Sequence, residues 1–142
     1  MKSPIGFLSV ATLAAVLAAP LAAQTIRVTA TVPFEFMVAG RSMPAGDYTV
    51  ATLGPNSTPV VRIANGNMSV VSLANSSTAS SKERAGQALL IFHRYGDRYF
   101  LARILDGDRE SGLEIPTSHS ERELSNTASL EKFETVTVLA RR

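Results

Sequence analysis

The chain contains no cysteine, and this absence narrows both its chemistry and its means of stabilisation. A chain without cysteine forms no disulfide bonds, although exported proteins commonly contain them. It also offers no thiolate ligand for structural zinc, and two histidines alone do not favour a zinc site. The folded state must therefore depend on apolar burial and on backbone hydrogen bonds.

An excess of charge of one sign is also missing, because 14 lysines and arginines face 12 aspartates and glutamates, for a net charge of +2. The arginines are scattered along the sequence, whereas nucleic-acid-binding proteins concentrate basic residues on one face. The sequence therefore predicts no nucleic-acid partner.

Two familiar catalytic motifs are absent: there is no Gly-x-Ser-x-Gly and no His-Glu-x-x-His. His93 has Tyr95 and Asp97 nearby in sequence and could act as a general base. Asp97, however, falls at the tip of a predicted turn, which favours a structural role for His93 beside Phe100. His119 is predicted to be an exposed residue at a helix start. We therefore expect no catalytic or cofactor-binding residues.

A weak calcium-loop pattern lies at Asp106–Glu110, where acidic residues alternate. The pattern fails at the positions that matter, because Ser111 replaces the glycine and Thr117 replaces the last glutamate. A solvated turn is the better interpretation, and no metal site is predicted.

The one long uncharged apolar run, Ile5–Ala19, is too short to span a bilayer, which takes about 20 residues. It follows a basic start and precedes small residues, the order of a secretory signal peptide with cleavage after Ala23. We therefore expect residues 1–23 to be a signal peptide and residues 24–142 to form one β-rich domain, periplasmic or extracellular, with no transmembrane segment after cleavage.

Most of the remaining chain shows strand patterns. Apolar residues alternate over Thr25–Val32. Asn65-Gly66 predicts a tight hairpin in which Ile63 faces Met68. The Ser/Thr-rich segment Asn75–Glu83 is expected to be a loop. Further strands are expected at 34–38, 48–53, 113–115 and 133–139, and a second polar loop at 106–112.

A short helix is predicted near the C-terminal end of the chain. Ser118 and Glu121 fit a capping box, with the serine at the N-cap and the glutamate three residues later. The helix should continue to about Leu124 and end near Asn126. One brief helix among several short strands predicts an all-β fold, either an antiparallel sandwich or a small barrel.

The central element is a predicted hairpin over Ala88–Leu105 that turns at Gly96-Asp97. Pairing across a two-residue turn sorts its side chains onto two faces. The face expected in the core holds Leu89, Ile91, His93, Phe100, Ala102 and Ile104. The other face, which is mixed, holds Leu90, Phe92, Arg94, Tyr99, Leu101 and Arg103.

The mixed face of this hairpin leaves two interpretations open. A second sheet or the helix covers it, which is the favoured interpretation because sandwich strands bury one face and often part of the other. Alternatively it is a partner or ligand surface formed by Phe92, Arg94, Tyr99, Leu101 and Arg103. In either case Arg94 could form a cation–π pair with Tyr99.

Three segments together resemble a family of small exported bacterial proteins without an assigned function. They are Val32–Val38 with Met43–Tyr48, His93–Leu101, and Ile115-Pro116 with Ser118 and Glu121–Leu124. The resemblance covers most of the chain after the leader and implies export and a β-rich domain. It supplies no catalytic residues. Met43, where the family pattern has leucine before Pro-Ala-Gly, is a conservative departure.

The sequence therefore favours an exported, non-catalytic binding or envelope-associated structural module, with an unidentified protein or envelope partner. One alternative is an enzyme of an unrecognised type that uses His93. Another is an outer-membrane barrel, although most predicted strands are shorter than the roughly 9–11 residues of a spanning strand. The oligomeric state is not predicted.

Overall fold

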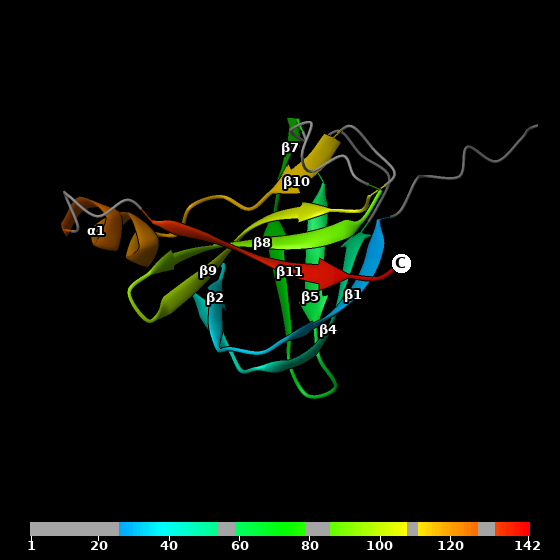
Figure 1. Cartoon of the computed structure of the whole chain (residues 1–142), viewed down its shortest axis with the longest axis horizontal. Coiled ribbons are helices and arrows are strands. Elements are labelled where there is room, and N and C mark those ends of the chain that lie inside the picture. Colours follow the sequence, from blue (N-terminus) through cyan, green and yellow to red (C-terminus); the bar gives the residue numbers. More distant parts are fainter. Residues whose placement is uncertain (1–25, 54–58, 79–85, 108–110, 128–132) are drawn as a thin grey trace, which may run out of the picture.

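The computed structural model describes residues 26–53, 59–78, 86–107, 111–127 and 133–142. Two β-sheets pack face to face, and one short helix stands at the end of the longest hairpin (Figure 1). The predicted all-β fold with one C-terminal helix is confirmed, and the sheets do not close into a barrel. The predicted signal peptide lies outside the described residues.

The first sheet has four antiparallel strands in the order β1-β4-β5-β6. Its strands are β1 (Arg27–Val32), β4 (Gly46–Leu53), β5 (Val60–Ala64) and β6 (Ser69–Leu73). In β1 the buried positions are Val28, Ala30 and Val32, as the alternating pattern predicts. One face of this sheet therefore packs inward, while the other faces solvent.

The second sheet has the order β11-β8-β9-β10-β7, and β2 and β3 flank it. Its strands are β8 (Ala88–Tyr95), β9 (Arg98–Leu105), β10 (Ser111–Glu114), β7 (Asn75–Thr78), β11 (Glu134–Ala140), β2 (Phe36–Val38) and β3 (Arg41–Met43). Strand β2 pairs in parallel with β9 through Met37 and Phe100. The other pairings are antiparallel, so hairpins build most of this sheet.

The two sheets meet at two corners. At one corner, β6 of the first sheet continues through the buried Ala74 into β7 of the second sheet. At the other corner, Thr29 of β1 and Arg141 exchange two backbone hydrogen bonds of 2.7 Å. These connections fix how the sheets face each other.

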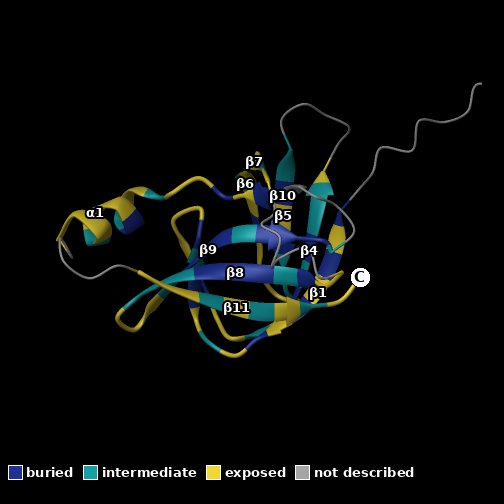
Figure 2. Ribbon diagram, turned by 45° about the horizontal axis from the view of Figure 1, so that its top comes forward, coloured by how far each residue is buried: buried dark blue, intermediate teal, exposed yellow. Residues whose placement is uncertain are grey.

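The space between the sheets is filled by aromatic and branched side chains, shown in dark blue in Figure 2. The Phe36 ring meets the rings of Tyr48 and Phe92 edge-on, at centroid distances of 5.1 and 5.3 Å. Edge-to-face contacts of this kind stabilise a core beyond the area that they bury. The core thus joins the first sheet, through Tyr48, to the central hairpin, through Phe92.

The predicted hairpin forms as β8 and β9 and turns at Gly96-Asp97, but the prediction of its core face is wrong. A β-bulge shifts the register, so that Phe92 faces Leu101 while Ile91 faces Arg103. Ala102 is the extra residue, and its carbonyl accepts a hydrogen bond of 2.8 Å from the Ile115 amide.

The main core is instead lined by the face predicted to be mixed, because the aromatic residues before and within β2 and those of the first sheet pack against it. The main core residues of this hairpin include Leu90, Phe92 and Leu101 from that face, together with Ile104 from the face predicted to be in the core. On the opposite face, Ile91 and Leu105 are buried in a separate cluster with Leu89. Both faces therefore contain buried apolar residues, and alternation alone could not tell which one faces the other sheet.

Two further expectations need correction. Asn65 begins a four-residue loop in place of a two-residue turn, because its Oδ1 accepts hydrogen bonds from the amides of Asn67 and Met68 at 3.2 and 2.9 Å. Ile63 consequently faces Val70 and not Met68. The polar segment expected to be a loop contributes the strand β7, which pairs along its whole length with β10. The rest of that segment lies outside the described residues.

The helix α1 (His119–Thr127) begins where the sequence predicts. The Ser118 hydroxyl accepts a hydrogen bond of 3.2 Å from the Glu121 amide, which is the interaction of an N-cap serine. Only Glu121 of this helix is buried. Within the described residues, no helix is long and apolar enough to cross a membrane.

Candidate functional site

The five residues predicted to form a surface on the hairpin do not share one exposed face. Phe92 and Leu101 are buried, with exposed fractions of 0% and 3%. Tyr99 is half-buried and stacks on Phe34 at a centroid distance of 3.9 Å. The sequence favoured burial of this face over a partner surface. Phe92 and Leu101 are buried, and Tyr99 is partly buried, as that interpretation expects.

Arg94 and Arg103, the two charged members of this predicted surface, point to different sides of the hairpin. Arg94 lies over the Tyr99 ring at 5.5 Å, as predicted, and forms an ion pair of 3.3 Å with Glu134. The bulge places Arg103 on the side of Ile91, where its Nη2 donates a hydrogen bond of 2.9 Å to the Thr78 carbonyl. The predicted partner surface is therefore divided between the core and two separate locations.

His93 forms the best-defined polar cluster in the described residues. Its Nδ1 lies 2.8 Å from Oε1 of Glu121, whose side chain is only 6% exposed. The imidazole ring also packs on Phe133 at a centroid distance of 4.1 Å. Tyr95 donates a longer hydrogen bond of 3.4 Å to the same carboxylate oxygen. Burial raises the pKa of the Tyr95 phenol, and the negative charge of Glu121 raises it further.

This cluster connects α1 to the hairpin. Glu121 is the buried residue of the helix, and both of its polar partners lie on β8. The helix otherwise stands away from the two sheets (Figure 1). His93 faces Phe100 across the hairpin, as the structural interpretation expects. The contact between His93 and Glu121 therefore joins the helix to the hairpin.

A small hollow of about 280 Å³ lies beside the same cluster. His93, Glu121 and Arg103 contribute to its wall together with the hydroxyl-bearing residues Ser77 and Thr117. A histidine held by a carboxylate resembles the base of a general acid–base pair. Among the described residues the side-chain partner of His93 is Glu121, and no hydrogen bond joins His93 to a hydroxyl.

A second hollow, of about 990 Å³, lies on the solvent-facing side of the first sheet. Pairing places Arg27 of β1, Ala51 of β4 and Arg62 of β5 in one row across three strands. Two strand spacings separate the arginines, or roughly 10 Å, and the small alanine between them forms the floor. We refer to this hollow as the arginine groove.

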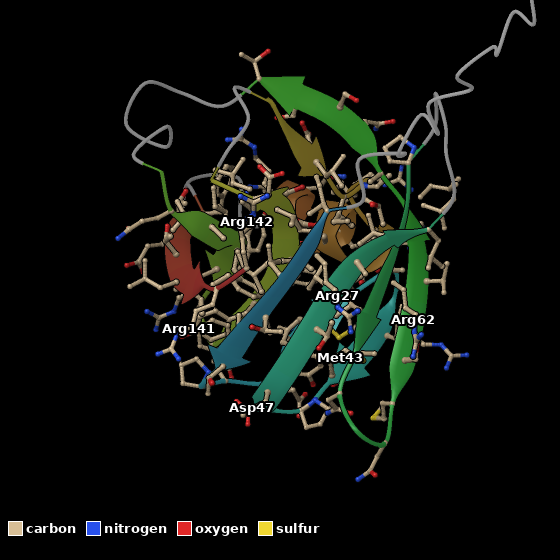
Figure 3. All side chains as sticks on the ribbon, turned by 90° about the vertical axis from the view of Figure 1, so that its right-hand side faces the viewer. Arg27, Met43, Asp47, Arg62, Arg141 and Arg142 are labelled. Atoms are coloured by element: carbon tan, nitrogen blue, oxygen red, sulfur yellow. The ribbon has the colours of Figure 1, made fainter. Side chains whose placement is uncertain are left out.

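The next row of the arginine groove contains two threonines and a third arginine. Thr29 and Thr49 face each other there, and Arg141 closes the row through its bridge to Thr29. Asp47 is the acidic residue of the lining, and the Thr31 hydroxyl donates a hydrogen bond of 2.5 Å to its carboxylate. Figure 3 shows this side of the molecule, with Arg27 over the sheet, Arg62 at its right-hand edge, Arg141 to the left and Asp47 below.

The three arginines of the groove are exposed, and in the described part of the chain none of them forms an ion pair. Arg62 donates a hydrogen bond of 3.1 Å to the Ser69 hydroxyl, which orients its side chain along the sheet. Guanidinium groups match carboxylates and phosphates through paired N–H donors. The arginine groove can therefore hold an anionic group above the alanine floor.

The sequence predicted neither the arginine groove nor the contact between His93 and Glu121, although it indicated part of each. Arg27 and Arg62 fall on the outward positions of strands that were correctly predicted, but their pairing through β4 was not. Glu121 was identified as a capping residue, whereas its side chain contacts His93. The described residues hold no group of three or more candidate metal ligands, and residues 108–110 of the calcium-like segment lie outside them.

Comparison with known proteins supplies no precedent for this arrangement: no family model, no curated protein and no solved structure matches the chain.

Proposed function

We propose that the chain is an exported, non-catalytic binding module, and that its arginine groove holds an acidic segment of a partner protein. The leader pattern of residues 1–23 and the resemblance to exported β-rich proteins support export. The observation that carries the binding proposal is the row Arg27–Ala51–Arg62, in which two exposed cations flank a small residue.

The chemistry of the lining favours a peptide over other anionic polymers. Its aromatic residue, Tyr48, is 2% exposed and therefore offers no ring for a base or a sugar to stack on. Proteins that bind single-stranded nucleic acid generally use exposed aromatic platforms together with positive charge. Carboxylates spaced along an extended peptide need only the guanidinium groups and the threonine hydroxyls that the groove provides.

The first test is a binding measurement on residues 24–142 with a fluorescein-labelled peptide of ten glutamates. The double variant Arg27→Ala/Arg62→Ala should weaken binding at least tenfold, because each charge-assisted contact contributes about 1.5–3 kcal/mol and tenfold corresponds to about 1.4 kcal/mol. Fluorescence anisotropy at low salt measures the affinity. Raising the salt concentration should weaken binding by the unmodified domain.

The matched control is Arg98→Ala/Arg122→Ala, which removes the same charge from exposed positions on the hairpin and α1. Equal weakening by both double variants would show attraction by net charge alone and would contradict the proposal. Absence of binding at low salt would also contradict it. Tighter binding of an oligonucleotide or an acidic polysaccharide of equal charge would overturn the choice of a peptide ligand.

A second candidate function, an enzyme that uses His93, is favoured by the 2.8 Å contact between His93 and Glu121 beside a hollow. The two interpretations of this pair predict different results. As a structural pair, His93→Ala and Glu121→Ala should each lower the free energy of unfolding by about 1–3 kcal/mol. His93→Ala leaves the buried Glu121 carboxylate with only the longer contact from Tyr95, and Glu121→Ala leaves the partly buried imidazole without its carboxylate partner. Their effects should not add in the double variant.

Chemical denaturation of the four proteins of this cycle measures the coupling between the two residues. The unmodified domain should show no turnover of ester, amide or phosphoester substrates. Turnover that disappears in a folded His93→Ala variant would favour the enzyme and contradict the binding-module proposal. Additive effects on stability would contradict the structural function of the pair.

A further inference from the structure

Strand β6 forms one edge of the first sheet. It pairs with β5 over five consecutive positions, from Ala64 with Ser69 to Val60 with Leu73, and this pairing contains no bulge. In the part of the chain that the structure describes, no strand pairs with its other side. The outer edge of β6 is therefore a straight row of backbone groups with no strand partner among the described residues.

The hydrogen bonds between β5 and β6 show which residues of β6 have backbone groups that point outward. The Asn65 amide donates to the Met68 carbonyl at one end of the β5–β6 pair, and the Ala74 amide donates to the Pro59 carbonyl at the other. Bonded and non-bonded pairs alternate along an antiparallel ladder, so Val70 and Ser72 bond to β5. The backbone groups of Ser69, Val71 and Leu73 consequently point outward.

Strand β6 itself contains none of the features that usually keep sheet edges apart, which include charged side chains, prolines and bulges. The charged side chain of Arg62, on β5, reaches only Ser69, at one end of this edge. Residues 63–81 contain no charged residue and no proline. Val71 and Leu73 are 54% and 60% exposed, on the same side of the sheet as the arginine groove. The edge is therefore both capable of further pairing and apolar.

We propose that β6 pairs antiparallel with β6 of a second copy of this chain, around a two-fold axis at Val71. Val71 then lies opposite its own copy, and Ser69 lies opposite Leu73, so every outward backbone group on the edge finds a partner. The two exposed apolar side chains of each edge gain cross-strand neighbours. This inference does not depend on the ligand of the arginine groove.

The positions of the nearest charges and the length of the β6 edge are both compatible with a dimer of this chain. Arg62 lies one strand inward from Val71, so three strand spacings, or roughly 14 Å, separate the backbone positions of the two copies of Arg62. The hydrogen bond to Ser69 holds each guanidinium near the end of the edge, away from the two-fold axis. The distance between the two copies exceeds the Debye length of about 8 Å at physiological salt, and repulsion is therefore small. A five-residue edge buries less area than the roughly 1,200–2,000 Å² of stable complexes, so the dimer should be weak and concentration-dependent.

Sedimentation velocity of residues 24–142, from about 1 to about 200 µM, tests the proposal, because mass action makes the dimer fraction rise with concentration. The unmodified domain should shift from monomer to dimer over this range. Val71→Lys should remain monomeric, because the two lysines would lie directly opposite each other with their Cα atoms about 5.5 Å apart. Val71→Thr, which keeps an uncharged β-branched side chain, should still form the dimer.

Leu139→Lys is the control for added charge, because Leu139 is 66% exposed on β11 and should leave the dimer intact. Circular dichroism and thermal melting show whether each variant remains folded. If Val71→Lys unfolds, Ser69→Lys supplies the same charge at the end of the edge. A monomer at every concentration, or a dimer that both lysine variants of β6 leave unchanged, would overturn the proposal.

Discussion

Replacing Phe92 with alanine should lower the free energy of unfolding by about 3–5 kcal/mol, a large share of the roughly 5–15 kcal/mol that stabilises a domain of this size. Phe92 is 0% exposed and meets the rings of Phe34 and Phe36 edge-on at 5.1 and 5.3 Å. Its removal leaves a cavity between the two sheets, where the backbone of β8 cannot move inward without breaking its pairing with β9 and β11.

Urea denaturation followed by far-ultraviolet circular dichroism measures this loss. Phe92→Leu should be less damaging, because it retains most of the apolar volume. Leu139→Ala, at a residue that is 66% exposed, should change stability by no more than about 0.5 kcal/mol. A loss below about 1 kcal/mol for Phe92→Ala would place this ring on a surface and would contradict the two-sheet core.

Gly107→Ala should also be strongly destabilising, for two reasons that add. Gly107 has a φ of +82°, a left-handed conformation that costs other residues about 1–2 kcal/mol. A Cβ atom there would lie 2.7 Å from the Gln87 carbonyl carbon and 2.9 Å from the Ala88 amide nitrogen. These are backbone atoms that cannot rotate away, and overpacking of this kind costs about 1–3 kcal/mol more.

Gly86 supplies the matched control for this prediction. Its φ is +75°, but a Cβ atom built there would have no neighbour within 4 Å. Gly86→Ala should therefore lose only the conformational part, and the difference between the two variants measures the contact between the end of β9 and the start of β8. Equal losses in thermal or urea denaturation would show that this close approach does not exist in solution.

The sequence predicts well those elements that depend on interactions between residues close together in the chain. The alternation over β1 fixes which of its side chains turn inward, and Ser118 caps the helix through an amide only three residues away. The bulge at Ala102 has no comparable signal, because most of the residues around it are apolar on both faces of the hairpin. A shift of one residue was enough to move Arg103 to the opposite side of the hairpin.

The candidate site could not be predicted for a related reason. Arg27 and Arg62 become neighbours only because β4 pairs with both of their strands, and Arg141 joins them through the bridge to Thr29. The sequence shows these arginines as scattered, and only the strand order brings them to one face. The same holds for Glu121 and His93, which tertiary packing alone brings together.

Backbone amide chemical shifts, recorded while residues 24–142 are titrated with the glutamate peptide, test the central claim most directly. The account predicts that the largest shifts fall on the arginine groove, at Arg27, Thr49, Ala51 and Arg62, and that they disappear in Arg27→Ala/Arg62→Ala. Shifts concentrated instead around His93 and Glu121, or no shifts at saturating peptide, would contradict it.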